Sequence, residues 1–367
     1  MTVAPARVAR PAVDRAKRAR RRALSVLGGA LGLAGIVWVV RGLDYDRLAT
    51  ILATADPGFL LLVPLAIAIE QLIRAWKWGR LLDGLRGIGT LRLFGATMAG
   101  YLVNLLTPFG VSPLVRSWLV ARLEGLTMSA LLATVAIDRL LDGIVFVGLV
   151  VLVLVFAAFP DPNGEIRLGL ALAGMGSLVV IVFLGFALRH HKRQIARGAG
   201  WILHLTDRLP ARFAGRSQAL LRSFSDGVVW PRERWRRVAV IVASAVVKLI
   251  AATHFLWAGL AFGIVLRPFD YLFLIVFLGF LIILTHVARI PGGFFVGAVF
   301  AVDLLGVGAE QALAMVTVVI ASNVSIIGVV GVFTLWRNGI ALADLRTGNT
   351  TDSDGGACRD PQAAVSE

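Results

Sequence analysis

The chain has 367 residues, of which 58% are hydrophobic and only 16% are charged, and its mean hydropathy is +0.82. Soluble domains are about 45–50% apolar and about 25% charged, so this composition excludes a soluble globular protein and indicates a membrane protein. The net charge of +15 comes from Lys and Arg between apolar runs, which indicates membrane topology and not nucleic-acid binding. The single cysteine, Cys358, excludes an internal disulfide and a thiolate metal site.

Residues 1–23 form a basic tail, with eight Lys or Arg residues and one Asp in the first 22 positions. An apolar run at 24–40 follows, and no small-x-small cleavage site comes after Val40. We therefore expect an uncleaved first span, with a removed signal peptide as the alternative. The positive-inside rule predicts that the tail is cytoplasmic.

An integral membrane domain is predicted over residues 24–336, followed by a polar, disordered tail at 337–367. Within this domain, the loop at 189–237 carries twelve Lys or Arg residues against three acids, so we assign it to the cytoplasm. The loop is either a set of interfacial helices or a solvated basic segment. Charge counting places both termini on the cytoplasmic side of the cell (inner) membrane, in a multi-pass topology.

Two apolar segments are interrupted by Pro and Gly. The segment at 94–107 is about 22 Å long as a helix, against a hydrocarbon core of roughly 30 Å, and "PFGVSP" follows it. The loops that flank this region are predicted on opposite sides of the membrane, so the chain must cross an odd number of times between them. A re-entrant hairpin that turns at 108–110, followed by one true span, meets this requirement. The segment at 270–306 must start and end outside, and it breaks at Pro291, Gly292 and Gly293. At this second break the alternative is a simple helix kink or a turn at the surface.

The predicted fold is therefore an all-α, polytopic helical membrane protein with about 6–8 transmembrane helices and two re-entrant broken segments. One broken segment enters from the cytoplasm and the other from outside. This arrangement indicates a possible inverted repeat, as in secondary transporters, where broken segments meet near the midplane and form the binding site.

Polar side chains within apolar runs are the candidate site residues, because a charge at membrane depth costs several kcal/mol unless it is paired or hydrated. Asp138 and Asp142 are four residues apart and share a helix face, with Arg139 on the adjacent flank. These three residues form either a structural clip between helices or a phosphate site in which the carboxylates hold the Arg139 guanidinium. Both functions can coexist.

A second group of candidates surrounds the first break. Gly100, Asn104 and Pro108 recur every four residues, which predicts a helix face suited to close packing or to the wall of a polar cavity. Arg116 follows the break and is either a headgroup ligand or an interfacial arginine. The run that contains Glu70, Arg74, Lys77 and Trp78 is either an aromatic belt with basic anchors or an entry site for anionic headgroups.

Motifs for catalysis are missing from the sequence. The five His residues do not have the spacing of metal ligands, and the chain contains no glycine-rich nucleotide loop, nucleophile elbow or HExxH pattern. We therefore expect no enzymatic activity, no cofactor and no metal.

Taken in order, "RAWKWGRLL", "GYLVNLLTPFGVSPLVR", "DRLLD", a basic loop and "IPGG" resemble the membrane part of the lysylphosphatidylglycerol synthase family, also called the flippase-like domain. The resemblance covers about residues 20–336 and implies an integral membrane module that moves or accommodates lipids. The residues that match the family motifs are Lys77, Trp78, Gly100, Asn104, Pro108, Arg116, Asp138, Arg139, Asp142, Pro291, Gly292 and Gly293.

Two family carboxylates are missing, because Pro113 and Ala298 stand where relatives have glutamate. His286 and Arg289 are then the ionisable groups nearest the second break, so we include them in the predicted site. The resemblance implies a lipid transporter whose partners are membrane lipids of anionic or isoprenoid type. The alternatives are an accessory membrane subunit that does not transport and a transferase acting on polyprenyl lipid. The oligomeric state is left open.

Overall fold

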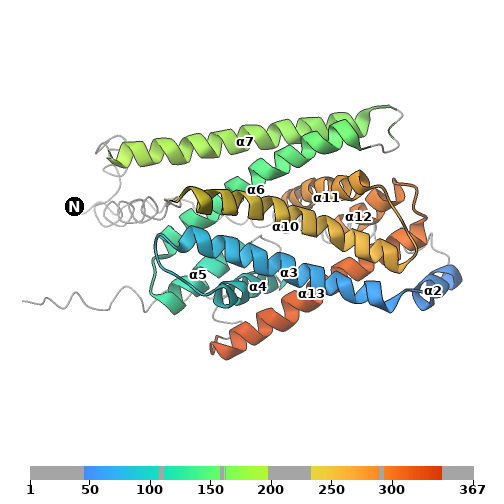
Figure 1. Cartoon of the computed structure of the whole chain (residues 1–367), viewed down its shortest axis with the longest axis horizontal. Coiled ribbons are helices and arrows are strands. Elements are labelled where there is room, and N and C mark those ends of the chain that lie inside the picture. The colour runs from blue at the N-terminus through green and yellow to red at the C-terminus, as the bar shows by residue number, and fades with distance from the viewer. Residues whose placement is uncertain are drawn as a thin grey trace, which may run out of the picture.

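The computed structural model describes residues 45–106, 111–157, 161, 163–196, 233–288 and 293–340. This part of the chain folds into helices and contains no β-strand, which confirms the predicted all-α class (Figure 1). The helices are α2 (Tyr45–Ala53), α3 (Pro57–Leu82), α4 (Thr90–Leu106), α5 (Ser112–Glu124), α6 (Met128–Phe156), α7 (Glu165–Ala196), α10 (Arg234–Ala261), α11 (Pro268–Ala288), α12 (Gly293–Asp303) and α13 (Ala309–Arg337).

Six of these helices are long and apolar enough to cross a membrane, namely α3, α6, α7, α10, α11 and α13. The chain is therefore a multi-pass helical membrane protein, as the sequence predicts. The expected first span at 24–40 and the tail beyond 340 lie outside the described residues, and so do positions 197–232 of the basic loop predicted at 189–237. The predicted bounds of this loop are too wide, because 189–196 belong to α7 and 234–237 to α10.

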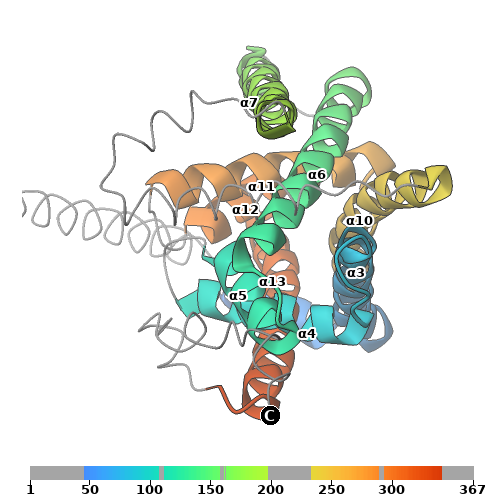
Figure 2. The ribbon, with the colours of Figure 1, turned by 90° about the vertical axis from the view of Figure 1, so that its left-hand side faces the viewer.

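Helices α3 and α10 form an antiparallel pair at one side of the bundle (Figures 1 and 2). At one end, the Asp56 backbone N–H donates to the Ala261 carbonyl at 2.9 Å. At the other end, Arg236 forms an ion pair with Asp83 at 3.5 Å. We call the end that holds Asp83 and Arg236 the basic end, and the end that holds Asp56 and Ala261 the opposite end.

Helices α4 and α5 form a short hairpin that leaves from the basic end and returns to it. Glu124, the last residue of α5, forms ion pairs with Arg86 at 3.5 Å and with Arg92 at 3.0 Å, and both arginines lie near the start of α4. With 17 and 13 residues, the two helices are about 26 and 20 Å long, so neither spans a core of roughly 30 Å. This pair is the broken, returning segment that the sequence predicts, although its turn at 107–110 lies outside the described residues.

Helices α11 and α12 form the second broken segment, with a different division of lengths from the one expected. The 21 residues of α11 contain a window that is apolar and long enough to cross the membrane, whereas α12 has only 11 residues. The reason is that no proline interrupts the run between Pro268 and Pro291, and its one glycine, Gly279, lies within α11 without ending it. Close packing joins the two helices, because a Cβ at Gly297 would lie 2.4 Å from a Leu281 methyl carbon.

The order of elements is the same in both halves of the domain: a long helix, a broken pair and another long helix. In the first half these are α3, α4–α5 and α6, and in the second half α10, α11–α12 and α13. Because α3 and α10 run antiparallel, this order agrees with the predicted inverted repeat. Helix α7 lies at the edge of the bundle, beside α6 (Figures 1 and 2).

Two apolar clusters make up most of the core, and polar residues lie where they meet. In α3, Ile67 belongs to one cluster and Ala75 to the other, and in α6 the corresponding residues are Leu149 and Val135. Glu70 and Arg74 lie between the pair of α3, and Asp138 and Asp142 lie between the pair of α6, whereas Lys77 lies two residues beyond Ala75, among residues of the second cluster. The buried charges therefore form a layer at the boundary of the two apolar cores, on the side of the second one.

Candidate functional site

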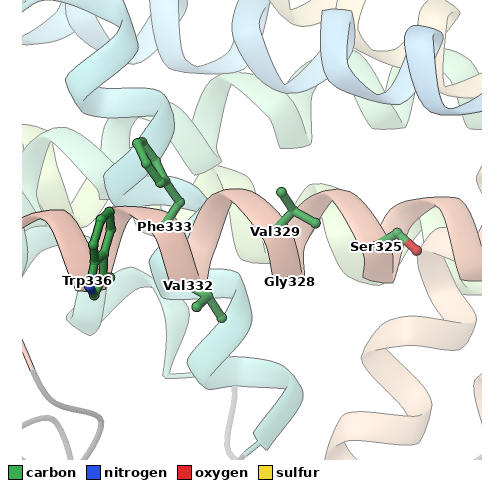
Figure 3. Close-up of a pocket in the computed structure, with 6 residues that line it drawn as sticks. All are labelled: Ser325, Gly328, Val329, Val332, Phe333 and Trp336. Carbon is green, nitrogen blue, oxygen red and sulfur yellow. The ribbon is translucent and has the colours of Figure 1, made fainter.

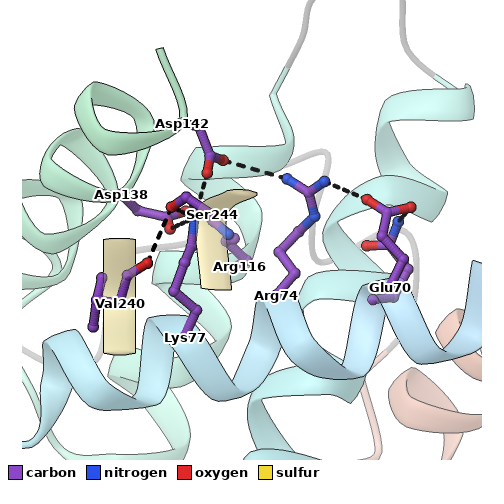
Figure 4. A network of polar contacts seen from close by, with 9 residues as sticks. Glu70, Arg74, Lys77, Arg116, Asp138, Asp142, Val240 and Ser244 are labelled. Carbon is purple, nitrogen blue, oxygen red and sulfur yellow. Dashed lines mark hydrogen bonds and ion pairs between the residues drawn. The ribbon is translucent and has the colours of Figure 1, made fainter. Parts of the chain in front are cut away.

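Seven ionisable side chains from four helices form one continuous row of contacts in this layer, shown in part in Figure 4. Six of them alternate in sign along the row, and a histidine lies at its first end. We call this row the charged chain; its members in order are His254, Glu70, Arg74, Asp142, Lys77, Asp138 and Arg116.

Lys77 lies at the centre of the charged chain and is completely buried. Its ammonium forms an ion pair with Asp138 at 2.9 Å and another with Asp142, and it donates a hydrogen bond to Ser244 Oγ at 3.1 Å. The i, i+4 spacing on α6 lets both carboxylates face this one lysine of α3. Lys77 thus ties α3, α6 and α10 together.

The first half of the charged chain runs along α3. Arg74 bonds Glu70 at 2.5 Å, one turn earlier on the same helix, and forms an ion pair with Asp142 at 3.5 Å. His254 of α10 places its Nε2 atom 3.7 Å from Glu70, and Gln71 donates to the same carboxylate at 3.3 Å. Every member of this half is therefore partnered by a neighbouring helix or by the next turn of its own.

Arg116 ends the charged chain in the α4–α5 hairpin. Its guanidinium bonds Asp138 at 3.3 Å and lies over the Trp78 ring, 4.7 Å from the centroid. Trp78 is fixed in turn, because its indole N–H donates to Thr134 Oγ1 at 3.1 Å. The Arg116 side chain is therefore held on both sides, by a carboxylate and by an aromatic face.

Close approach of α4 to α5 depends on Gly100. A Cβ there would lie 2.9 Å from the Ser112 carbonyl oxygen and 3.4 Å from Arg116 Cβ, so any side chain would push the helices apart. Several buried polar atoms of this hairpin have no hydrogen-bond partner among the described residues, which leave out the turn at 107–110: Arg116 Nε, Asn104 Oδ1, Ser112 Oγ and Ser117 Oγ. They give the hairpin unused capacity to donate to and accept from a polar headgroup.

The expected pairing of Arg139 with Asp138 and Asp142 is wrong. Arg139 is exposed and forms no ion pair with any residue that the structure describes, whereas Lys77 and Arg116 occupy the carboxylates. The physical reason is helix geometry: Arg139 is rotated about 100° from Asp138, away from α3.

The structure leaves several predicted site residues unplaced. Pro108, Arg289, Pro291 and Gly292 lie outside the described residues, and so does the side chain of His286, which belongs to the last turns of α11. Gly293 is the first residue of α12, and Ala298 is buried within that helix.

Sequence reasoning missed two residues that belong with the charged chain. Ser244 accepts from Lys77, and nothing in its apolar surroundings sets it apart. Lys248 could have been recognised as the one cation within "VASAVVKLIAATHF". Its ammonium lies 5.6 Å from the Phe146 ring centroid.

A separate apolar groove of about 640 Å³ runs along α13 (Figure 3). Its lining consists of Ser325, Gly328, Val329, Val332, Phe333 and Trp336. None of these residues belongs to the charged chain. The groove is open and apolar, which suits acyl chains, and it contributes no charge to the site.

Comparison with known proteins agrees with this architecture. The family described as the lysylphosphatidylglycerol synthase TM region matches residues 25–331. A UPF0104 membrane protein of Methanothermobacter thermautotrophicus is 25% identical over 207 residues, which is 55% of this chain and 60% of that relative. The matched stretch thus spans less than two thirds of the relative's length. Because the family match covers most of the chain, this multi-pass membrane protein belongs to the lysylphosphatidylglycerol synthase TM region family.

Proposed function

We propose that this protein is a flippase-like transporter that moves an anionic or isoprenoid-type lipid between the leaflets of the cytoplasmic membrane, without catalysing a covalent reaction. Both chain termini are then cytoplasmic. The observation that carries the proposal is the charged chain, because ionisable groups at membrane depth mark substrate or ion pathways. Its buried charges lie beside a broken helix pair, which is where transporters build their sites.

The geometry suggests how a headgroup would be handled. The guanidinium of Arg116 is anchored at one nitrogen by Asp138, while its buried Nε atom is unused. A lipid phosphate can accept from such a fork bidentately, and the neighbouring hydroxyl groups of α5 can add hydrogen bonds. The acyl chains would stay in the hydrocarbon core of the membrane, while the headgroup contacts the charged side chains.

A non-transporting accessory subunit is the second candidate. It is favoured by the pairing within the charged chain, since a buried network whose members satisfy one another can have the fixing of helix packing as its sole role. A protein of this kind would bind or support other membrane components without moving lipid.

Reconstitution in liposomes separates the two functions. Fluorescent phosphatidylglycerol in the inner leaflet is followed as it reaches an external quencher, with protein-free vesicles as the baseline. The transporter predicts faster exchange than the baseline and a loss of about tenfold in Arg116→Lys, which keeps the charge and loses the planar fork. Arg122→Gln is the matched control, because this exposed arginine of α5 lies over Trp118 and outside the charged chain. Exchange at the protein-free rate would contradict transport.

A further inference from the structure

Lys248 is a cation within the membrane domain for which the structure supplies no counter-ion. It is residue 15 of the 28 in α10, so it lies about 20 Å along the helix from either end. None of the carboxylates that the structure describes forms an ion pair with it, and its ammonium lies over the face of the Phe146 ring. Such a charge is costly at this depth unless something else pairs with it or hydrates it.

The nearby carboxylates are already engaged by other cations. Asp142 faces Lys77 and Arg74, Asp138 faces Lys77 and Arg116, and Glu70 faces Arg74. Lys248 interacts electrostatically with Asp142 and Glu70 at longer range, and it is repelled by Arg74 and by Arg139.

Counting formal charges shows what is left over. The charged chain contains three cations and three carboxylates, with His254 as a further base, so it is balanced when that histidine is neutral. Lys248 of α10 and Arg139 of α6 add two positive charges that no described residue neutralises.

The two surplus cations sit on neighbouring helices. The Lys248 ammonium lies over the ring of Phe146, which is two turns beyond Arg139 on α6. The Phe146 ring packs in turn against Phe280 of α11, with centroids 5.1 Å apart. Gly279 of α11 makes room for that ring, since a Cβ there would lie 2.6 Å from it. The platform under Lys248 is therefore fixed, while Arg139 is exposed on the same side of α6.

We propose that Lys248 and Arg139 form a phosphate-binding site for the headgroup of an anionic membrane lipid, between α6 and α10. This inference rests on the proposed function and specifies its substrate class. A phosphate with one or two negative charges offsets half or all of the surplus and accepts from the ammonium and from the guanidinium fork, while the lipid tails stay in the apolar surroundings of these helices. A phosphate-free lipid leaves both cations uncompensated.

The test measures binding and does not depend on transport. The full chain in neutral detergent is titrated calorimetrically with dioctanoyl phosphatidylglycerol, inorganic phosphate and dioctanoylglycerol. We expect Lys248→Met and Arg139→Gln each to weaken phosphatidylglycerol binding about tenfold or more, because each removes a charge-assisted hydrogen bond. Lys248→Arg keeps the charge and stays within about threefold. Arg122→Gln, which removes an equal charge at the basic end, leaves the affinity unchanged.

Thermal melting of the lipid-free protein separates ligand binding from a structural role. Because no described carboxylate pairs with Lys248, Lys248→Met should melt at the wild-type temperature or above it. Arg139→Gln changes an exposed side chain and should fold. If Lys248→Met does not fold, the phosphatidylglycerol affinity of Arg139→Gln decides whether the site exists.

Unchanged affinity in Arg139→Gln and in a folded Lys248→Met would overturn the site. Equal binding of dioctanoylglycerol would overturn the phosphate, and inorganic phosphate binding as tightly as the lipid would overturn the lipid source. Lys248-dependent binding together with exchange at the protein-free rate would support this site and contradict transport, so the two proposals fail separately.

Discussion

Lys77 is the residue on which most of the buried electrostatics depends. It is the only cation that the two α6 carboxylates share, and it has no exposure to solvent. Removing one member of a buried ion pair leaves an uncompensated charge, which costs about 3–5 kcal/mol.

Lys77→Met should therefore destabilise the protein by about this amount, measured as a lower midpoint of thermal unfolding in detergent. Adding Asp142→Leu to Lys77→Met should restore part of the stability, because it removes the one carboxylate that the remaining cations of the charged chain, Arg74 and Arg116, do not balance. A single variant that melts like the wild type would contradict the central role of Lys77.

Gly100 provides a second test at this scale. Gly100→Leu should force α4 away from Ser112 and Arg116, at a cost of about 1–3 kcal/mol for overpacking. Gly87→Leu is the matched control, because a Cβ at Gly87 meets nothing within 4 Å. Equal unfolding midpoints for the two variants would show that α4 and α5 do not approach as closely as described.

Residue spacing within one helix could be predicted from the sequence, and contacts between helices could not. The i, i+4 spacing of Asp138 and Asp142 indicates a shared face, and this is confirmed. The cation that fills that face is Lys77, which is 61 residues from Asp138 and 65 from Asp142 in the chain. Arg139 was the nearest arginine in sequence, and helix rotation turns it away.

At the scale of elements, charge counting identified the α4–α5 hairpin from its length and flanking loops alone. The ion pairs of Glu124 with Arg86 and Arg92 show that both of its ends meet at the basic end. Charge counting was less informative for α11, because a run without a breaker can be either half of a hairpin or a full span.

Cysteine labelling tests this arrangement directly. In a Cys358→Ser background, Leu91→Cys and Leu123→Cys should react with an impermeant maleimide from the same side, since both exposed residues lie at the basic end. Val265→Cys, exposed in the loop between α10 and α11, should react only from the other side. Labelling of positions 91 and 123 from different sides would contradict the hairpin.

At the scale of the whole molecule, the layer of charges between two apolar cores is the feature that a function must explain. Replacing a buried ion pair by apolar residues of similar volume is often neutral or stabilising, so helix packing alone is a weak reason for a layer of this kind. A charged layer retained at membrane depth is more typical of a substrate pathway. The same layer contains Lys248, whose charge the described residues leave uncompensated.

The distinction between a pathway and a structural clip can be made with one double variant. Arg116→Met with Asp138→Leu removes one positive and one negative charge together, and Lys77 keeps its ion pair with Asp142. Folding should therefore survive, which thermal melting checks. The deciding measurement is the rate of phosphatidylglycerol exchange between leaflets in proteoliposomes. If the charged chain is the route of the headgroup, the folded double variant exchanges lipid at the rate of protein-free vesicles; exchange at the wild-type rate would contradict this account.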